Sequence, residues 1–142
     1  MLFTVGTTTI DFKDGNILTA TEVYSFIQRI HISIGGYDDF VDGNLGKRIE
    51  KYDRYICKEI PLFKLHFGNY LLDDDKIFEY TDLTTPIPPI LLDSKNNVED
   101  GNHRCKAVEW NYETSERDDI EIPMMRCFVP YSYRGKILAK WR

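Results

Sequence analysis

Five consecutive residues carry the groups best suited to chemistry in this chain, the run Asp100-Gly101-Asn102-His103-Arg104. After it the apolar residues take on helical spacing, which predicts a helix that opens at this run. A glycine, an amide, an imidazole and a guanidinium would then lie where free backbone N–H groups point outward. Backbone donors, a positive side chain and the positive end of the helix dipole together favour a phosphate or another oxyanion.

The elements on either side are expected to present this motif at a helix end. Residues 88–93 predict a strand, 94–97 a polar turn, and 98–99 a short returning strand. The helix is expected over 101–112, with Asp100 as its N-cap, because a carboxylate can accept hydrogen bonds from first-turn amides. Its apolar face is predicted to hold Cys105, Val108 and Tyr112.

A strand, a turn and a D-G-x-H-R run that opens a helix resemble the ParB/sulfiredoxin superfamily. The resemblance is strongest over residues 86–112 and extends over roughly 52–130. In that superfamily a related G-x-H-R signature lies at a helix N-terminus and holds the phosphates of a nucleotide. The resemblance therefore implies a nucleotide- or phosphate-binding protein in which residues 101–104 contact the ligand.

One position departs from the sulfiredoxin pattern. The residue before the His-Arg pair is the catalytic cysteine in sulfiredoxins, whereas here it is Asn102. Cys105 lies three residues later and around the helix, so it cannot take over that role. A buried, inert thiol is expected at Cys105, and sulfinic-acid reductase activity is not expected.

Superfamily relatives include nucleotide hydrolases, a kinase for a free amino acid and proteins described as nucleases. The first hypothesis is therefore a nucleotide hydrolase, phosphotransferase or nuclease that uses Mg²⁺ and a nucleoside triphosphate. His103 and Arg104 would neutralise phosphate charge, and Asp100, Glu99 or Asp93 would act as general base or magnesium ligand. Asp100 meets a physical objection, because a capping carboxylate lies where the phosphate should bind.

Two hypotheses without turnover remain. One is a nucleotide-gated or DNA-associated binding module, although partition proteins of this superfamily carry a helix-turn-helix after the domain and only a short segment follows residue 130 here. The other is an accessory interaction protein of a phage or mobile element, which would act on a protein partner.

The amino-acid composition limits the classes of protein to which this chain can belong. The chain has 142 residues, 42% of them hydrophobic and 29% charged, and a net charge of −5, which indicates one globular domain over residues 1–142. Three widely spaced cysteines fit a reducing cytosol, and with three separated histidines they give no metal-site spacing. No run is long enough to span a bilayer and no secretory signal is evident, so a cytoplasmic protein with no membrane partner is expected.

The first third of the chain predicts a scaffold of strands and one strong helix. Residues 2–18 read as strands with a two-residue hairpin turn at Asp14-Gly15. Thr19 and Glu22 form a capping box for a helix that runs to Gly35-Gly36. The expected buried stripe of this helix consists of Val23, Phe26, Ile27, Ile30 and Ile34.

Residues 37–43 are expected to form a loop and 45–55 a second, shorter helix. That helix carries Arg48, our first choice for a second cationic contact to a polyanionic ligand. Further strands are predicted over 60–67, 76–80 and 120–129, and the acidic cluster 73–75 is expected to be a solvated loop.

The segment from Val129 onward contains no acids and four cations, so it contributes +4 to the net charge of −5 and leaves −9 for the remainder. The basic tail (131–142) has two interpretations. Its aromatic and cationic residues suit a single-stranded nucleic acid, and its apolar residues Ile137, Leu138 and Trp141 suit docking on the body of the protein.

Together the pattern predicts a compact single α+β domain, with a mixed β-sheet packed against at least two helices. The ParB/sulfiredoxin-like fold that the resemblance implies has this architecture.

Overall fold

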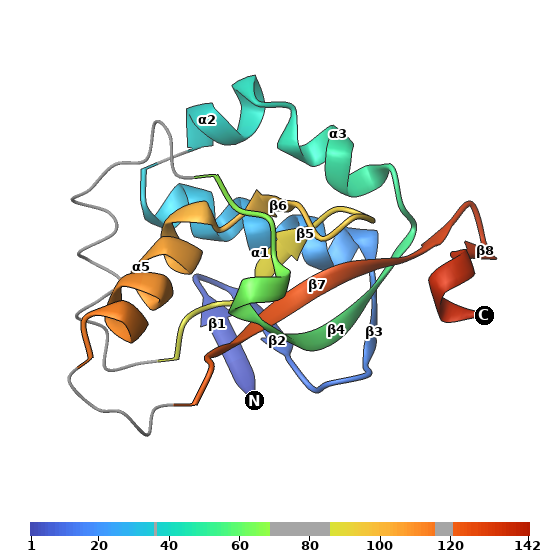
Figure 1. Ribbon diagram of the computed structural model, residues 1–142. Helices are drawn as coiled ribbons and strands as arrows, with labels where there is room; N and C mark the ends of the chain where they lie inside the picture. The colour runs from blue at the N-terminus through green and yellow to red at the C-terminus, as the bar shows by residue number, and fades with distance from the viewer. Residues whose placement is uncertain (36, 69–85, 116–120) are drawn as a thin grey trace. The chain divides into compact units, whose positions relative to one another are not determined.

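A computed structural model describes residues 1–35, 37–68, 86–115 and 121–142 of the chain. Figure 1 shows its helices and strands. In chain order they are β1 (Leu2–Val5), β2 (Thr8–Asp11), β3 (Ile17–Thr19), α1 (Ala20–Ser33), α2 (Tyr37–Asp42), α3 (Leu45–Glu50), β4 (Arg54–Pro61), η1 (Leu62–Lys64), β5 (Ile90–Leu92), β6 (Val98–Asp100), α5 (Asn102–Glu113), β7 (Met124–Tyr133), β8 (Lys136–Ile137) and η2 (Ala139–Trp141).

The fold is α+β, as predicted. Six strands form a mixed sheet in the order β3-β4-β7-β5-β6, with β8 paired to β7, and helices pack against it. The described chain divides into two compact units, which are treated separately below. Unit 1 comprises Met1–Lys58 and Phe128–Arg142, and unit 2 comprises Glu59–Cys127.

The hairpin of unit 1 turns at a different place from the predicted one. β1 and β2 pair antiparallel, and the chain reverses between Val5 and Thr8, where Gly6 has a φ of +60°. A tight turn does form at the predicted Asp14-Gly15, where the Asn16 N–H donates to the Lys13 carbonyl at 2.9 Å, but it lies on the connection from β2 to β3 and does not close a hairpin. There the Gly15 N–H donates to the Cys57 carbonyl at 2.8 Å, so the turn holds the chain against β4.

Helix α1 begins as the sequence predicts. The Thr19 side chain accepts from the Glu22 N–H, and the Glu22 carboxylate accepts from the Thr19 N–H, which completes the capping box. The predicted stripe is buried except for its last member, Ile34, which is the C-cap and is 46% exposed. The stripe reaches an aromatic core, in which Phe26 meets Phe128 edge-to-face at 5.9 Å.

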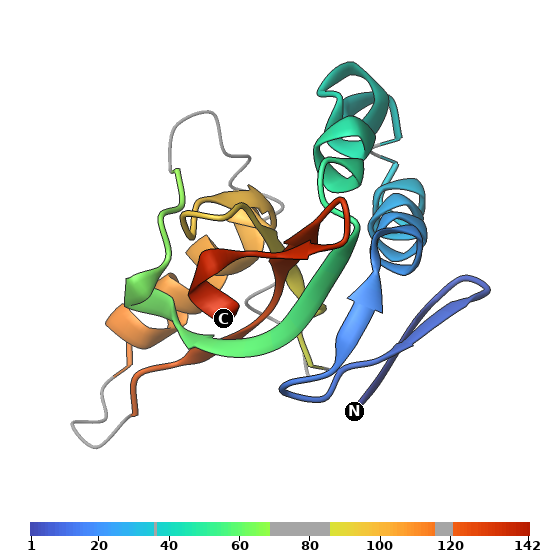
Figure 2. The ribbon, with the colours of Figure 1, turned by 90° about the vertical axis from the view of Figure 1, so that its right-hand side faces the viewer.

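The region after α1 is more helical, and then more extended, than predicted. Residues 37–42 form α2 where a loop was expected, and the predicted 45–55 helix ends at Glu50. The chain turns there because Arg54 pairs with Thr19 and begins β4. Figure 2 shows α1 beside α3, and the close fit is made at Gly46, where a Cβ would lie 2.6 Å from the ring of Tyr24.

In unit 2 the strands around the motif are as predicted and the flanking ones are displaced. β5 and β6 pair antiparallel; β5 lies within the predicted 88–93, and β6 extends one residue beyond the predicted 98–99, to Asp100. The predicted 60–67 strand is mostly wrong, because β4 ends at Pro61 and η1 follows. The last core strand starts at Met124 and continues to Tyr133, four residues beyond its predicted end. The predicted strand 76–80 and the acidic cluster 73–75 lie outside the described residues.

The predicted docking of the tail is confirmed for Trp141. Its indole Nε1–H donates to the Pro130 carbonyl at 2.9 Å, and its ring lies 6.0 Å from that of Tyr131. Leu138 is half-buried, whereas Ile137 is 40% exposed. Trp141 therefore fixes the end of the tail to Pro130 of β7.

Candidate functional site

The helix that carries the motif begins one residue later than predicted, and with a different cap. Gly101 is the N-cap of α5, with a φ of +115° and no side-chain capping bond. The prediction of Asp100 as N-cap is therefore wrong. Its carboxylate accepts a hydrogen bond from Nη2 of Arg104. A left-handed backbone at Gly101 turns the chain from β6 into the helix, a conformation that favours glycine.

Arg104 is the most buried member of the motif, with 2% of the residue exposed. Its Nη2 donates to the Asp100 carboxylate at 2.7 Å, and its Nη1 donates to the carbonyls of Pro88 and Pro89 at 3.1 and 2.8 Å. A buried guanidinium is stable only when its charge and donors are satisfied in this way. Arg104 therefore ties the start of α5 to the segment that leads into β5.

Asn102 joins the motif to the chain after β4. Its Oδ1 accepts from the Gly68 N–H at 3.0 Å, and its Nδ2 lies 3.5 Å from the Val98 carbonyl. His103 and Glu99, both half-buried, flank this residue and Asp100 on the helix and the strand. The motif is thus brought together at one strand-to-helix junction, as the sequence predicts, and much of it holds neighbouring segments in place.

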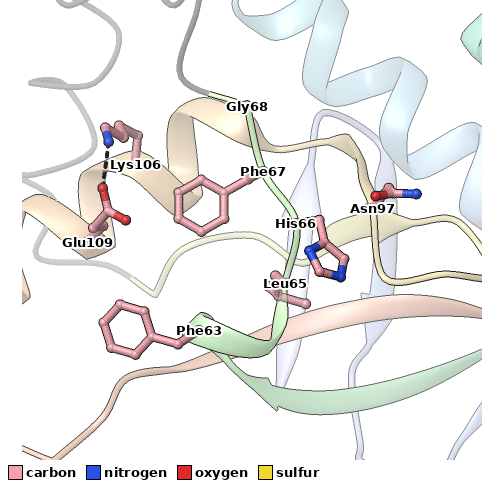
Figure 3. Close-up of a pocket in the computed structure, with 8 residues that line it drawn as sticks. All are labelled: Phe63, Leu65, His66, Phe67, Gly68, Asn97, Lys106 and Glu109. Atoms are coloured by element: carbon pink, nitrogen blue, oxygen red, sulfur yellow. Dashed lines mark hydrogen bonds and ion pairs between the residues drawn. The ribbon is translucent and has the colours of Figure 1, made fainter.

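A pocket of about 550 Å³ lies against α5 in unit 2. Its lining combines aromatic, charged and amide groups, contributed mainly by Phe63, His66, Phe67, Asn97, Lys106 and Glu109. Figure 3 shows the two phenylalanine rings grouped with the Lys106–Glu109 pair, while His66 and Asn97 lie toward the other side. Gly68, which Asn102 holds, also lines the pocket, so one motif residue positions part of its wall.

The charged groups in the pocket are paired with each other. The Lys106 ammonium lies 2.5 Å from the Glu109 carboxylate, one helical turn away on α5. The lysine side chain is 31% exposed, so solvent reaches it. Phe63 is 52% exposed, and its ring contacts that of Tyr112 edge-to-face at 5.5 Å. The pocket therefore offers a ligand both an exposed ring, that of Phe63, and an accessible cation, that of Lys106.

These lining residues were missed in the sequence because 60–67 was read as a strand. In that reading Phe63 and Phe67 lie on the same face as core residues. One signal in the sequence could have pointed to the pocket. Lys106 and Glu109 lie three residues apart, a spacing that brings their side chains together on the helix that begins at the motif.

The other predicted base, Asp93, is engaged in a turn. Its carboxylate accepts from the backbone N–H groups of Lys95 and Asn97 and from the Asn97 amide at 2.8–2.9 Å. Partial burial raises the pKa of Asp93, but the hydrogen bonds from Asn97 and Lys95 outweigh it and hold the pKa below its usual value. Asp93 thus shapes the turn between β5 and β6.

Cys105 is fully buried, as predicted for an inert thiol on this helix. Burial raises its pKa to about 12, which keeps it protonated and unreactive near neutral pH. Arg48, the predicted second cationic contact, lies on α3 in unit 1, where its Nη1 donates to the Gly43 carbonyl at 2.6 Å.

Within the described ranges, no group of three or more His, Cys, Asp or Glu side chains is arranged to hold a metal ion. No helix in these ranges is long and apolar enough to span a membrane. No family model, curated protein or solved structure matches the chain.

Proposed function

We propose that this protein is a ParB/sulfiredoxin-like domain that binds a nucleotide, and that the pocket beside α5 is the binding site in place of residues 101–104. The observation that carries the proposal is the link between motif and pocket, in which Asn102 holds Gly68 at the pocket wall. Small-molecule sites typically enclose about 300–1,000 Å³ and combine apolar walls with a few polar groups. This pocket, at about 550 Å³, has that size and that lining.

The lining supplies a contact for each part of a nucleotide. The exposed face of Phe63 and the ring of Phe67 suit a base, because aromatic rings stack on bases of any sequence. The Lys106 ammonium suits a phosphate, which it would bind while it stays paired with Glu109. His66, also in the lining, adds an imidazole donor.

The proposal covers binding and assigns no catalytic base. Asp100 is paired with Arg104, and Asp93 accepts three hydrogen bonds in its turn. A magnesium ion would arrive bound to the phosphates of a nucleoside triphosphate. Glu109 in the lining is paired with Lys106, so we assign that ion no protein ligand.

The proposal is tested by thermal unfolding with nucleoside mono-, di- and triphosphates, with and without magnesium. A ligand that binds only the folded state stabilises it by about 2.7 kcal/mol at a hundred times its dissociation constant. Lys106→Ala removes the phosphate contact, and Lys47→Ala on α3 is the matched control, because Lys47 is an exposed helical lysine in unit 1.

We expect a nucleotide-dependent rise in the midpoint for the wild type and Lys47→Ala, reduced for Lys106→Ala. Phe63→Ala is expected to reduce it as well, through loss of stacking. Arg104→Ala is unsuitable here because it would destabilise the fold itself. The absence of any shift in the wild type would refute nucleotide binding, and an undiminished shift in both Lys106→Ala and Phe63→Ala would exclude this pocket.

A further inference from the structure

Unit 1 carries a basic surface built from the end of β7, β8, η2 and one residue of β4. Arg134, Lys136, Lys140 and Arg142 are exposed, and the Lys58 side chain is 34% exposed. Figure 2 shows the β7–β8 hairpin and η2, both in red, leading to the last residue. These elements bring together cations from two separate parts of the sequence, because Lys58 and Lys140 both lie over the ring of Trp141, at 5.8 and 5.5 Å.

The acids nearby do not cancel this charge. Asp53 accepts from the Ser132 hydroxyl at 2.5 Å and from the Gly135 N–H at 2.6 Å, so it holds the β7–β8 turn closed. The Asp14 carboxylate lies 3.9 Å from the Lys58 ammonium, a long and solvent-exposed pair. Counted over the described residues alone, these two carboxylates against five cations leave the surface positive within a chain whose net charge is −5.

Aromatic rings are interleaved with the cations. The Trp141 ring is held by its indole N–H bond to Pro130 and remains partly exposed. Tyr133 is also partly exposed, and the Arg134 guanidinium lies 4.8 Å from the centre of its ring. Fixed rings beside exposed cations form a platform on which an unpaired base can stack, with a lysine or arginine displaced from the ring face to meet the phosphate.

We infer that this surface, formed by Lys58, Arg134, Lys136, Lys140, Arg142 and the rings of Tyr133 and Trp141, binds single-stranded nucleic acid. A single strand fits better than a duplex, because stacking requires bases whose faces are free. Proteins that grip a duplex along many phosphates carry a more extensive basic face, whereas this chain is acidic overall. The inference is independent of nucleotide binding in the pocket beside α5.

The test measures binding of a labelled oligothymidine of about 12 nucleotides by fluorescence anisotropy, a length that covers one site of this kind. A matched duplex and an oligouridine serve as the other probes. The chain has two tryptophans, so Trp110→Phe leaves Trp141 as the reporter, and a stacked base should quench its emission. Lys136→Ala/Lys140→Ala removes two cations, and Lys47→Ala/Lys51→Ala removes two exposed lysines elsewhere in unit 1 as the control.

We expect oligothymidine or oligouridine to quench Trp141 and to bind more tightly than the duplex. Lys136→Ala/Lys140→Ala should bind about tenfold more weakly at roughly 50 mM salt, with the slope of log affinity against log salt lowered by about 0.7 for each lysine. The control pair should bind as the wild type does, with unfolding midpoints confirming folded protein.

Three results of the binding assay would overturn the inference. They are no binding by the wild type at low salt, equal weakening by the control pair, and duplex binding as tight as single-strand binding. Unchanged Trp141 emission in a complex that does form would remove the stacking role and would equally count against the proposed surface.

Discussion

The carboxylate of Asp100 lies 2.7 Å from Nη2 of Arg104, which follows it by four residues in the chain. The two side chains are only 11% and 3% exposed. This buried ion pair links the last residue of β6 to the first turn of α5. Arg104 also holds the carbonyls of Pro88 and Pro89, so a residue predicted to face a phosphate supports the fold. Removal of either partner would leave an uncompensated buried charge.

Arg104→Ala should lower the free energy of unfolding by about 3–5 kcal/mol, because it removes the donor groups that the Asp100 carboxylate and two backbone carbonyls bind. Arg104→Lys keeps the charge but not the planar fork of donors, and it should recover part of that loss. Urea unfolding measures both. Arg48→Ala, at an exposed arginine on α3, should cost less than about 1 kcal/mol. Equal stability of the two alanine variants would contradict the structural role of Arg104.

Gly101→Ala should destabilise the protein by about 2–4 kcal/mol, through both strain and overlap. The residue has a φ of +115°, and an added Cβ would overlap Cγ2 of Ile90 and lie 2.8 Å from its Cβ. Gly15→Ala is the control, because Gly15 has a φ of +93° but no atom within 4 Å of an added Cβ. It should show the strain alone, about 1–2 kcal/mol. The difference in urea midpoint between the variants measures the contact with Ile90.

Ser132→Ala should cost about 2 kcal/mol at neutral pH, since it removes a hydrogen bond to an ionised carboxylate. That bond is the main reason why the pKa of Asp53 lies below its ordinary value of 3.8, and the Gly135 N–H adds to it against desolvation. A lowered pKa stabilises the fold above about pH 4, and the benefit disappears as the pH falls through the folded-state pKa. The stability gap between wild type and variant should therefore narrow below about pH 4, and a gap that is constant with pH would contradict this origin.

The three cysteines should be unreactive in the folded protein. Burial raises the pKa of Cys57 to about 11 and that of Cys105 to about 12, and it also raises the pKa of Cys127. A thiol-reactive disulfide reagent near neutral pH should therefore modify them only as fast as the protein opens, and completely in denaturant. Rapid modification of Cys105 under native conditions would reveal an exposed nucleophile and reopen redox chemistry at the motif.

Local signals in the sequence predicted local structure well. The capping box of Thr19 and Glu22 and the position of α5 depend on neighbours within a few residues, and both are confirmed. β4 and β7 were misplaced because pairing with distant strands sets their limits, as when Arg54 meets Thr19. Asp100 was misassigned because capping competes with Arg104 for the same carboxylate, and spacing alone does not decide that competition.

The pocket could not be predicted from the sequence for a similar reason, because contacts between residues far apart in the chain form it. Phe63 and Phe67 alternate like strand residues in the sequence, but the chain leaves the sheet at Pro61 and passes along α5. The bond from Gly68 to Asn102 spans 34 positions and has no signature in the sequence. The phosphate-binding role of residues 101–104 remains a prediction.

The buried pair at the start of α5 also bears on how this sequence can diverge. A change at Asp100 alone or at Arg104 alone leaves one charge without its counterpart, while Gly101 admits no side chain beside Ile90. Positions 100 and 104 are therefore expected to covary among relatives, and position 101 to stay glycine, whether or not a ligand binds. Selection for folding alone would therefore constrain three of the five positions in this run, which are 100, 101 and 104.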